Sequence, residues 1–437
     1  MQSAFLFLLL SLFPMIFAKD DKTPLRICLF VEPSPFTYMS GYANRFQALL
    51  NYLANKHPED DVKIVTTEVV NTKNLPQIWL GFPIHYTAGF RLPHYPLMSL
   101  SWDYTFRSLR TVAHHRPHII HASSPGFLVL SAALISRMFS IPLLVSYHTH
   151  LPIYVRTYLP KLFGLPEWIV WQWIRWVHHV LADVTIVTSP QIQQEFQQHG
   201  IDQVMVWPKG VDTETFHPRY KDETMRVIMT DGHKEDFLVV YVGRIATEKG
   251  LHLLPEIMKR LPPNVRLSCI GNGPYEAELR SLLLPTERAF FTGPLQGRAL
   301  SKAFASADVF VMPSTSETLG FVVLESMASG VPVVAARAGG LVDLIRDGET
   351  GFLVTPNDAD EYANRICQLR SDVGLRDKMA NRARLDTETW SWTASMETLR
   401  NQYYSVARQN MRLRWEQRLW NMFSFQGTSM CGWQSEE

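Results

Sequence analysis

The sequence predicts an α/β protein in which two doubly wound domains face each other across a cleft. Short apolar runs rich in β-branched residues alternate with longer helical segments, a pattern typical of parallel strands buried on both faces. Twelve such runs are too many for one small sheet, and a polar stretch at 221–236 without apolar periodicity divides them into two sets. An eight-stranded closed barrel is the competing α/β layout, and the polar break in mid-chain disfavours it.

The composition is that of a chain with a large buried core. Of the 437 residues, 46% are hydrophobic and 19% are charged, which is unlike a disordered chain. The formal net charge of +1 excludes a bulk electrostatic footprint for nucleic acid, so no nucleic-acid partner is expected. The four cysteines lie far apart and form no CxxC pair, which predicts neither a disulfide framework nor a structural zinc site.

The first segment of the chain, residues 4–18, is apolar apart from Ser11 and Pro14. It is shorter than the roughly 20 residues that a helix needs to cross a bilayer. Ala18 precedes a charged run at 19–22, which favours a signal peptide over residues 1–18. A short membrane anchor is the alternative, and in either case residues 1–18 are excluded from the fold prediction.

Six strands are expected in the first domain, which spans 25–215, and six in the second, which spans 216–392. The apolar runs of the first domain are at 25–31, 62–66, 118–121, 142–147, 183–188 and 204–207. Those of the second domain are at 237–242, 265–270, 289–292, 309–312, 333–336 and 352–354. The domains are expected to join near residue 215, with a binding site at the carboxyl ends of the strands.

Two loops of the second domain carry residues that suit a phosphate ligand. The strand at 237–242 runs into a loop that contains Arg244 and Lys249. A pair of cations at the carboxyl end of a parallel strand faces the cleft and suits a diphosphate, although an exposed loop with solvated charges is the alternative. The following strand ends at Gly271, where a missing side chain lets a ligand approach the backbone, but turns from strand to helix often use glycine.

A third motif, S-E-T-L-G-F-V-V-L-E at 316–325, follows the strand expected at 309–312. The backbone N–H groups of Gly320, Phe321 and Val322 are expected at the start of a helix, where they can hold an anionic phosphate. Glu325, about one turn further along, can accept hydrogen bonds from ribose hydroxyls. Glu317, before the helix, can meet a transferred sugar.

Together these motifs resemble the retaining family-4 glycosyltransferases of GT-B fold. The resemblance spans nearly all of 25–405 and rests on G-R…K-G at 243–250, the Glu317/Glu325 pair, S-G-V-P at 329–332 and G…G-F at 348–352. It implies two Rossmann-like domains, the first binding the acceptor and the second the nucleotide sugar. It also implies that the C-terminal segment at 393–423 contains a helix that crosses back to the first domain.

Longer strings are similar to the sulfoquinovosyltransferases that make the plant and algal sulfolipid. They lie at 31–36, 40–47, 121–126, 146–150, 291–297 and 335–340. The resemblance implies a hexosyltransferase that moves sulfoquinovose from UDP-sulfoquinovose to diacylglycerol with retention, and with neither a metal nor another cofactor. The alternatives are a related lipid transferase that uses UDP-glucose, UDP-galactose or GDP-mannose, and a non-catalytic nucleotide-sugar scaffold. No oligomeric state is predicted.

The resemblance also implies roles for residues that contact the donor nucleotide. Arg244 and Lys249 match the cations that bind the diphosphate, and Glu325 matches the ribose ligand. Gly41 lets the first strand-to-helix loop approach the leaving phosphate, although many relatives have two glycines where this chain has one. Retention in this family is attributed to front-face attack, in which the departing phosphate accepts the proton of the acceptor hydroxyl.

Residues near the transferred sugar are also implied by the resemblance. Glu317 matches a carboxylate that contacts the hydroxyls of the donor sugar, and His148 matches a histidine that points at it. The sulfonate of the sugar is a permanent anion, and a buried anion must be paired, so a cation is expected near His148. The candidates are Arg45, Arg156 and Lys209, of which Arg45 and Lys209 are preferred, although either could instead form an ion pair between the domains.

A diacylglycerol acceptor implies a surface of the first domain that faces a membrane. A helix predicted at 166–181 has one apolar arc, with Trp168, Trp171, Trp176 and basic residues around it, which suits a bilayer interface; a core helix with exposed tryptophans is the alternative. Beyond about residue 405, a face rich in Arg, Trp and Met could bind anionic lipid. The sulfolipid implies a plastid membrane reached through the signal-peptide route, with the endoplasmic reticulum or a secretory-pathway membrane as the alternative.

Two patterns that are also found in metal sites are interpreted otherwise. Asp358-Ala359-Asp360 follows Pro-Asn at an expected helix start, where acidic residues favour the helix dipole. His148 and His150 are two positions apart, and a zinc site needs further ligands nearby. His150 is therefore predicted to be a hydrogen-bonded core residue.

Overall fold

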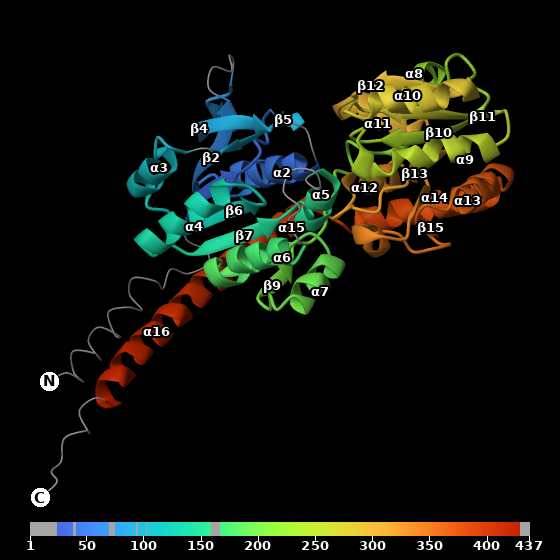
Figure 1. Ribbon diagram of the computed structural model, residues 1–437. Coiled ribbons are helices and arrows are strands. Elements are labelled where there is room, and N and C mark those ends of the chain that lie inside the picture. The colour runs from blue at the N-terminus through green and yellow to red at the C-terminus, as the bar shows by residue number, and fades with distance from the viewer. Residues whose placement is uncertain are drawn as a thin grey trace, which may run out of the picture.

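The computed structural model describes residues 24–37, 41–69, 75–92, 95–101, 103–158 and 167–428. Within them the chain forms two α/β units, each built on one sheet with helices on both faces (Figure 1). The predicted fold class is therefore confirmed, and the closed barrel is excluded. The leader expected at 1–18 lies outside the described residues.

The first unit contains, in its described part, a nine-stranded sheet with the order β3-β4-β2-β1-β6-β7-β8-β9 and with β5 paired to β4. Its predicted parallel strands are β1 (Arg26–Val31), β2 (Asp61–Val69), β6 (Ile119–Ser124), β7 (Leu143–Tyr147), β8 (Val184–Val187) and β9 (Val204–Val206). Its helices include α2 (Gly41–Lys56), α3 (Arg107–His115), α4 (Leu128–Phe139), α5 (Leu151–Tyr158), α6 (Glu167–Arg175) and α7 (Pro190–Gln198). Most residues of these strands are buried, as near-continuous apolar runs predict.

Three strands of this sheet were not predicted: β3 (Ile78–Trp79), β4 (Phe82–Leu92) and β5 (Tyr95–Ser101). They extend the sheet beyond β2, and β3 and β5 run antiparallel to β4. The carboxylate of the buried Glu32 accepts hydrogen bonds from the N–H groups of Ser101 and Leu128, which joins β5 and α4 to the end of β1. Burial raises the pKa of Glu32 to about 7, and these two N–H donors oppose the shift.

The second unit contains a six-stranded, all-parallel sheet with the order β12-β11-β10-β13-β14-β15. Its strands are β10 (Phe237–Val242), β11 (Val265–Ile270), β12 (Ala289–Gly293), β13 (Val309–Met312), β14 (Val333–Ala336) and β15 (Gly351–Val354). Its helices are α8 (Glu223–Met229), α9 (Leu254–Arg260), α10 (Glu276–Leu283), α11 (Gly297–Ala305), α12 (Phe321–Ala328), α13 (Ala359–Ser371) and α14 (Val373–Glu388). The polar stretch at 221–236 belongs to this unit, because Asp222 pairs with Lys302 of α11 and Arg226 of α8 pairs with Asp308.

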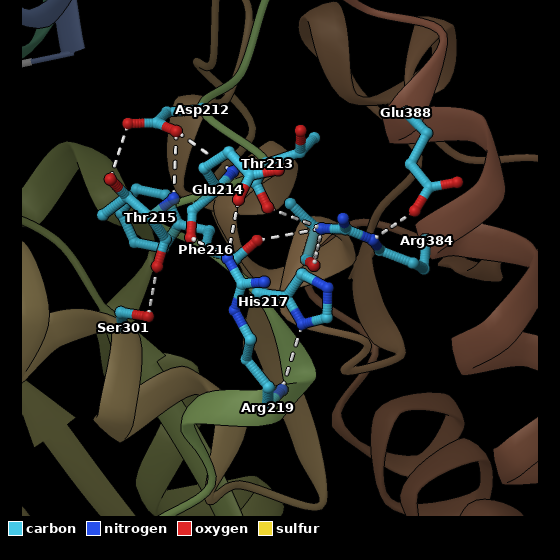
Figure 2. Close-up of polar contacts among 11 residues, drawn as sticks. Asp212, Thr213, Glu214, Thr215, Phe216, His217, Arg219, Ser301, Arg384 and Glu388 are labelled. Atoms are coloured by element: carbon cyan, nitrogen blue, oxygen red, sulfur yellow. Dashed lines mark hydrogen bonds and ion pairs between the residues drawn. The ribbon is translucent and has the colours of Figure 1, made fainter.

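The chain crosses between the units twice, and the two crossings are adjacent. Val211 on the outward crossing forms a β-bridge with Ser391 on the return. Figure 2 shows how the guanidinium of Arg384 on α14 holds the outward crossing. Its Nη1 donates to the carbonyl oxygens of Thr213 at 3.1 Å and Phe216 at 2.9 Å, and to that of Ala328 at the end of α12 at 2.7 Å.

After the return, the chain continues through α15 (Trp392–Glu397), a π-helical turn and α16 (Tyr404–Thr428), which pack on the first unit. Arg400 forms a buried two-point ion pair with Asp60, with Nε–Oδ2 and Nη2–Oδ1 distances of 2.8 Å. The hydroxyl of Tyr404 lies 3.1 Å from Nδ1 of His121 in β6. The end of α16 extends away from both units (Figure 1). The implied cross-over helix is therefore present.

Candidate active site

The starts of two helices, one from each unit, meet at the interface of the units. Helix α12 begins at Phe321 after Gly320, which has a φ of 87° and provides no side-chain cap. Helix α2 begins at Gly41, and a Cβ on this glycine would lie 2.3 Å from Cδ2 of Phe321. Neither helix has an acidic residue in its first turn. Because helix N-termini carry partial positive charge and N–H groups without intrahelical partners, this junction suits an anion.

Glu325 lies on α12 one turn beyond this junction, and its side chain is buried. In the described part of the chain, no hydrogen bond is made to its carboxyl group, which is unusual for a buried acid. Burial raises the pKa of Glu325 to about 8. A ligand with adjacent hydroxyl groups, such as a ribose, would supply the missing donors.

The cations predicted to hold a diphosphate are both paired with carboxylates. Lys249 Nζ lies 2.6 Å from Glu317 Oε1, and Arg244 forms an ion pair with the buried Glu248. The hydroxyl of Ser316 donates to the carbonyl oxygen of Glu248 at 3.1 Å, which joins the loop after β10 to the loop after β13. These loops therefore bring two cations and two carboxylates to one place at the carboxyl ends of adjacent strands.

Thr318 connects this cluster to the first unit. Its hydroxyl donates to the carbonyl oxygen of His148 at 2.9 Å, and its own carbonyl oxygen accepts from the hydroxyl of Thr188 at 2.8 Å. His148 follows β7 and Thr188 follows β8. Both threonines were missed by the sequence analysis, although Thr318 directly follows Glu317. Glu317 and His148, both assigned to the sugar, thus belong to segments that are hydrogen-bonded to each other.

The His148 side chain is buried among uncharged polar groups and aromatic rings. Its Nε2 lies 2.8 Å from the hydroxyl of Ser146, which also lies 3.0 Å from Nε2 of His121. Burial lowers the pKa of His148 well below the ordinary histidine value, and the nearby Arg45 and His121 lower it further. His148 is therefore neutral at physiological pH and can act as a hydrogen-bonding group rather than as a cation.

Arg45, one of the two preferred sulfonate candidates, is fully buried on α2. Its Nη2 lies 3.4 Å from the carbonyl oxygen of Pro208, while Nε and Nη1 have no hydrogen-bond partner in the part of the chain that the structure describes. The guanidinium carbon lies 4.6 Å from the ring centre of Trp207 and 5.4 Å from that of Phe321. Burial lowers the pKa of Arg45 to about 9, so the side chain carries its charge near neutral pH.

Lys209, the other preferred candidate, is occupied by a contact between the units. Its Nζ donates to the carbonyl oxygen of Asp343 at 2.7 Å and lies 4.1 Å from the ring centre of Trp390. The side chain of Arg156 lies outside the described residues. Gly271 has a packing explanation, since a Cβ there would lie 1.9 Å from the carbonyl oxygen of Gly243.

The two patterns that resemble metal sites have other roles. Asp358 Oδ1 accepts from the N–H of Glu361 at 2.9 Å and caps α13, and His150 Nε2 lies 2.9 Å from the Glu195 carboxylate. The capping role of Asp358 is confirmed, and His150 is hydrogen-bonded as predicted but partly buried rather than in the core. Among the described residues, no group of three or more His, Cys, Asp or Glu side chains is placed to hold a metal ion.

The tryptophan-rich helix is α6 followed by a π-helical turn at Trp176–Leu181. The expectation that Trp171 flanks an exposed stripe is wrong: Trp171 is buried and stacks on His199 with 3.6 Å between ring centres. Trp168 and Trp176 are exposed. The helix is thus a core helix with exposed tryptophans. No helix in the described ranges has the length and apolar character required to span a bilayer.

Two doubly wound units that bring helix N-termini, paired cations and a buried carboxyl group together define a nucleotide-sugar glycosyltransferase of GT-B fold. Residues 39–215 match the family described as Glycosyltransferase Family 4, and residues 230–386 match Glycosyl transferases group 1. The chain belongs to this glycosyltransferase family and is a hexosyltransferase of the group that includes sulfoquinovosyl transferase SQD2.

The similarity to SQD2 of Arabidopsis thaliana is 42% identity over 400 residues, which cover 90% of this chain and 76% of that protein. A GDP-mannose-dependent alpha-mannosyltransferase of Corynebacterium glutamicum is 30% identical and covers 89% of this chain and 91% of its own length. Solved structures support the fold. Sucrose-phosphate synthase of Thermosynechococcus elongatus has a TM-score of 0.70 and 22% identity, covering 87% of this chain and 98% of that one. Anabaena HepE, solved with UDP-glucose, has a TM-score of 0.67 and 21% identity, covering 85% and 98%.

Proposed function

We propose that this enzyme transfers sulfoquinovose from UDP-sulfoquinovose to diacylglycerol with retention and so makes the sulfolipid. The observation that carries the proposal is the 42% identity to a sulfoquinovosyl transferase over 90% of the chain. The similar mannosyltransferase is less identical, at 30% over 89% of the chain. A buried cation beside the residue assigned to the donor sugar supports an anionic sugar.

The departing diphosphate would lie at the junction of α2 and α12. Breaking the sugar–phosphate bond places negative charge on the leaving oxygen, and positive groups arranged in advance stabilise that charge. The groups that would stabilise this charge are the N-termini of α2 and α12 and the side chains of Arg244 and Lys249. Lys249 would then lie between the diphosphate and Glu317, and Glu317 would remain to accept a hydrogen bond from the sugar.

Retention would follow from attack on the face of the sugar that the phosphate leaves. The bond from the anomeric carbon to the phosphate oxygen breaks while the bond to the acceptor oxygen forms on the same face. The departing phosphate oxygen accepts the proton of the acceptor hydroxyl, so UDP leaves with it. His148, which is neutral because it is buried, would hydrogen-bond to the sugar in this mechanism without taking up that proton.

A surface of the first unit that would face the bilayer is formed by α4 and the π-helical turn after α6. Leu134 and Met138 lie one turn apart on α4 and are 65% and 58% exposed, and Val180 on the π-helical turn is also exposed. Arg137 joins the two elements, because its Nη2 donates to the carbonyl oxygens of Val180 at 2.7 Å and Leu181 at 2.8 Å. Exposed apolar side chains with a basic residue among them suit an anionic lipid surface.

Helix α16 would extend the same surface. A small cavity between α4 and α16 is lined by Arg137 and Ile141 on one side and by Met411, Arg414 and Trp415 on the other. Arg and Trp side chains at this place fit the region where lipid head groups meet the hydrocarbon. The compartment that we propose is a plastid membrane reached through a signal-peptide route, with an endoplasmic reticulum or secretory-pathway membrane as the alternative.

The decisive experiment supplies purified protein with diacylglycerol in anionic vesicles and with one donor at a time. Sulfoquinovosyldiacylglycerol detected by mass spectrometry is expected from UDP-sulfoquinovose. Product from UDP-glucose, UDP-galactose or GDP-mannose with none from UDP-sulfoquinovose would establish the alternative. Absence of UDP binding in a titration would overturn the mechanism as a whole.

The membrane surface has a separate test by vesicle flotation. The double substitution Leu134→Ser/Met138→Ser should reduce binding to anionic vesicles, because each side chain removed from the bilayer loses about 1.5–3 kcal/mol of transfer free energy. Leu385→Ser is the matched control, since Leu385 is an exposed leucine on α14 of the second unit. Equal flotation of the double variant and the wild type would exclude this surface.

A further inference from the structure

The buried guanidinium of Arg45 lacks the partners that a buried cation normally has. Its side chain is fully buried. Among the described residues, two of its three nitrogens have no hydrogen-bond partner, and the third makes one long contact of 3.4 Å to a carbonyl oxygen. Leaving a charge buried and unpaired is costly, so proteins pair such groups or use them to bind a ligand. An anion would supply the partner that Arg45 lacks.

The neighbours of Arg45 include residues assigned to the donor. Trp207 is a neighbour of both Arg45 and His148. The centre of its ring lies 4.6 Å from the Arg45 guanidinium and 5.8 Å from the centre of the His148 ring. Phe321, the first residue of α12, lies on another side of the guanidinium at 5.4 Å. Arg45 is therefore near both His148, which is assigned to the sugar, and Phe321, which begins the helix assigned to the phosphate.

Lys209 does not fill this role. Its ammonium group already donates to the Asp343 carbonyl oxygen across the interface and rests on the ring of Trp390. The sequence alone did not distinguish Lys209 from Arg45 as the sulfonate ligand. In the described structure Lys209 joins the two units, whereas the guanidinium of Arg45 still has N–H donors without acceptors.

We infer that Arg45 is the specificity residue that pairs with the sulfonate of the donor sugar. This inference rests on the proposed function. A sulfonate offers three acceptor oxygens and a charge that no physiological pH removes, which matches a guanidinium with unused N–H groups. A donor with a neutral hydroxymethyl group at the same carbon leaves Arg45 unpaired, so the cost of burying the charge discriminates against it.

The test compares the binding of UDP, UDP-glucose and UDP-sulfoquinovose to the wild type and to Arg45→Met. We expect the wild type to prefer UDP-sulfoquinovose over UDP-glucose by about 10²-fold or more, and Arg45→Met to lose most of that preference while binding UDP unchanged. Lys209→Met is the matched control, which should lower the affinity for both sugar nucleotides alike. Equal losses on both donors in Arg45→Met would overturn the inference.

Two further measurements keep the outcomes distinct. UDP-glucuronate carries a carboxylate at the same position, so it should compete better than UDP-glucose in the wild type and lose that advantage in Arg45→Met. Arg45→Lys retains the charge and should retain part of the preference, which separates loss of the anion partner from loss of fold. A wild type that makes no product from UDP-sulfoquinovose would contradict the proposed function, whereas a wild type that makes it with Arg45→Met unaltered in preference would contradict only this inference.

Discussion

Lys249 Nζ lies 2.6 Å from Glu317 Oε1, although 68 positions separate the two residues in the sequence. The pair joins a cation assigned to the diphosphate with a carboxylate assigned to the sugar. In this arrangement each charge holds the other in place before a donor arrives, which avoids the cost of reorienting them during the reaction. The same arrangement means that loss of Lys249 also leaves Glu317 without its partner.

Replacing the diphosphate cations should slow the chemical step. Arg244→Ala and Lys249→Ala should each lower kcat by on the order of 10²–10³, the cost of removing one group that stabilises developing negative charge. Lys259→Ala is the control, since Lys259 is exposed and pairs with Glu256 on α9, and its kcat should not change. Steady-state kinetics with saturating donor measure the effect, and an unchanged kcat in either variant would remove that residue from the mechanism.

The raised pKa of Glu325 predicts a pH dependence of stability. This carboxyl group has an ordinary pKa of 4.5 and a pKa of about 8 in the folded enzyme. The folded state therefore binds the proton more tightly, so the contribution to the free energy of unfolding is full below the ordinary pKa and is lost as the pH rises through about 8. Glu325→Gln, which cannot ionise, should become more stable relative to the wild type over this range in urea unfolding. A constant difference between the two proteins would contradict the prediction.

The buried ion pair of Arg400 with Asp60 should be strongly asymmetric to mutation. Arg400→Met leaves the Asp60 carboxylate buried without its cation and should lower the free energy of unfolding by about 3–5 kcal/mol. Asp60→Asn combined with Arg400→Met should cost less than the single change, because no unpaired charge remains. Arg412→Met, which removes a partly exposed pair with Glu416, is the control and should cost at most about 1 kcal/mol. Equal losses of unfolding free energy in Arg400→Met and in the double variant would show that the unpaired charge of Asp60 is not the cause of the destabilisation.

Arg384 should contribute more to the free energy of unfolding through its bonds to three carbonyl oxygens than through its ion pair with Glu388. Arg384→Met removes donors from three carbonyl oxygens, two of them on the crossing between the units (Figure 2), and should cost about 1–3 kcal/mol for each carbonyl left buried without water. Glu388→Ala keeps those bonds and should have little effect. Thermal unfolding distinguishes the two, and equal melting temperatures for both variants would exclude the predicted role.

Turnover should not require a divalent metal. The groups proposed to stabilise the leaving diphosphate are the helix N-termini and the two cations, all of which belong to the protein. Activity should therefore be the same in excess EDTA as in Mg²⁺ or Mn²⁺. Loss of turnover in EDTA that is restored by adding one metal would show that the protein's cations are insufficient.

The second sheet could be predicted from the sequence to within one residue per strand, because its strands are short, mostly apolar runs between turns. The extension of the first sheet was missed for a different reason. Strand β4 has apolar residues at 82, 84, 86, 88, 90 and 92 with Pro83, His85, Thr87, Gly89 and Arg91 between them, which is the alternation of a half-buried strand rather than a continuous apolar run. The prediction was based on continuous runs, which find strands buried on both faces such as β1, so it passed over this alternating strand beside β2.

The candidate site was only partly visible in the sequence. Motifs identified the loops that contain Arg244, Lys249 and Glu317, because their spacing is local. Trp171 stacks on His199, which directly follows α7 and is distant in sequence. The π-helical turn after α6 also interrupts the helical period from which the faces were assigned. The guanidinium of Arg45 is buried against the rings of Trp207 and Phe321. Both residues come from distant parts of the chain, so no sequence pattern near residue 45 could reveal this burial.

The β-bridge between Val211 and Ser391 places the two covalent connections of the units side by side. A rotation of one unit about these adjacent connections would move its distant parts furthest. Such a rotation would have to break the hydrogen bond from the Thr318 hydroxyl to the His148 carbonyl oxygen, which joins the units at the site. Opening of the interface would therefore separate Glu317 from His148 in the same movement that releases the nucleotide.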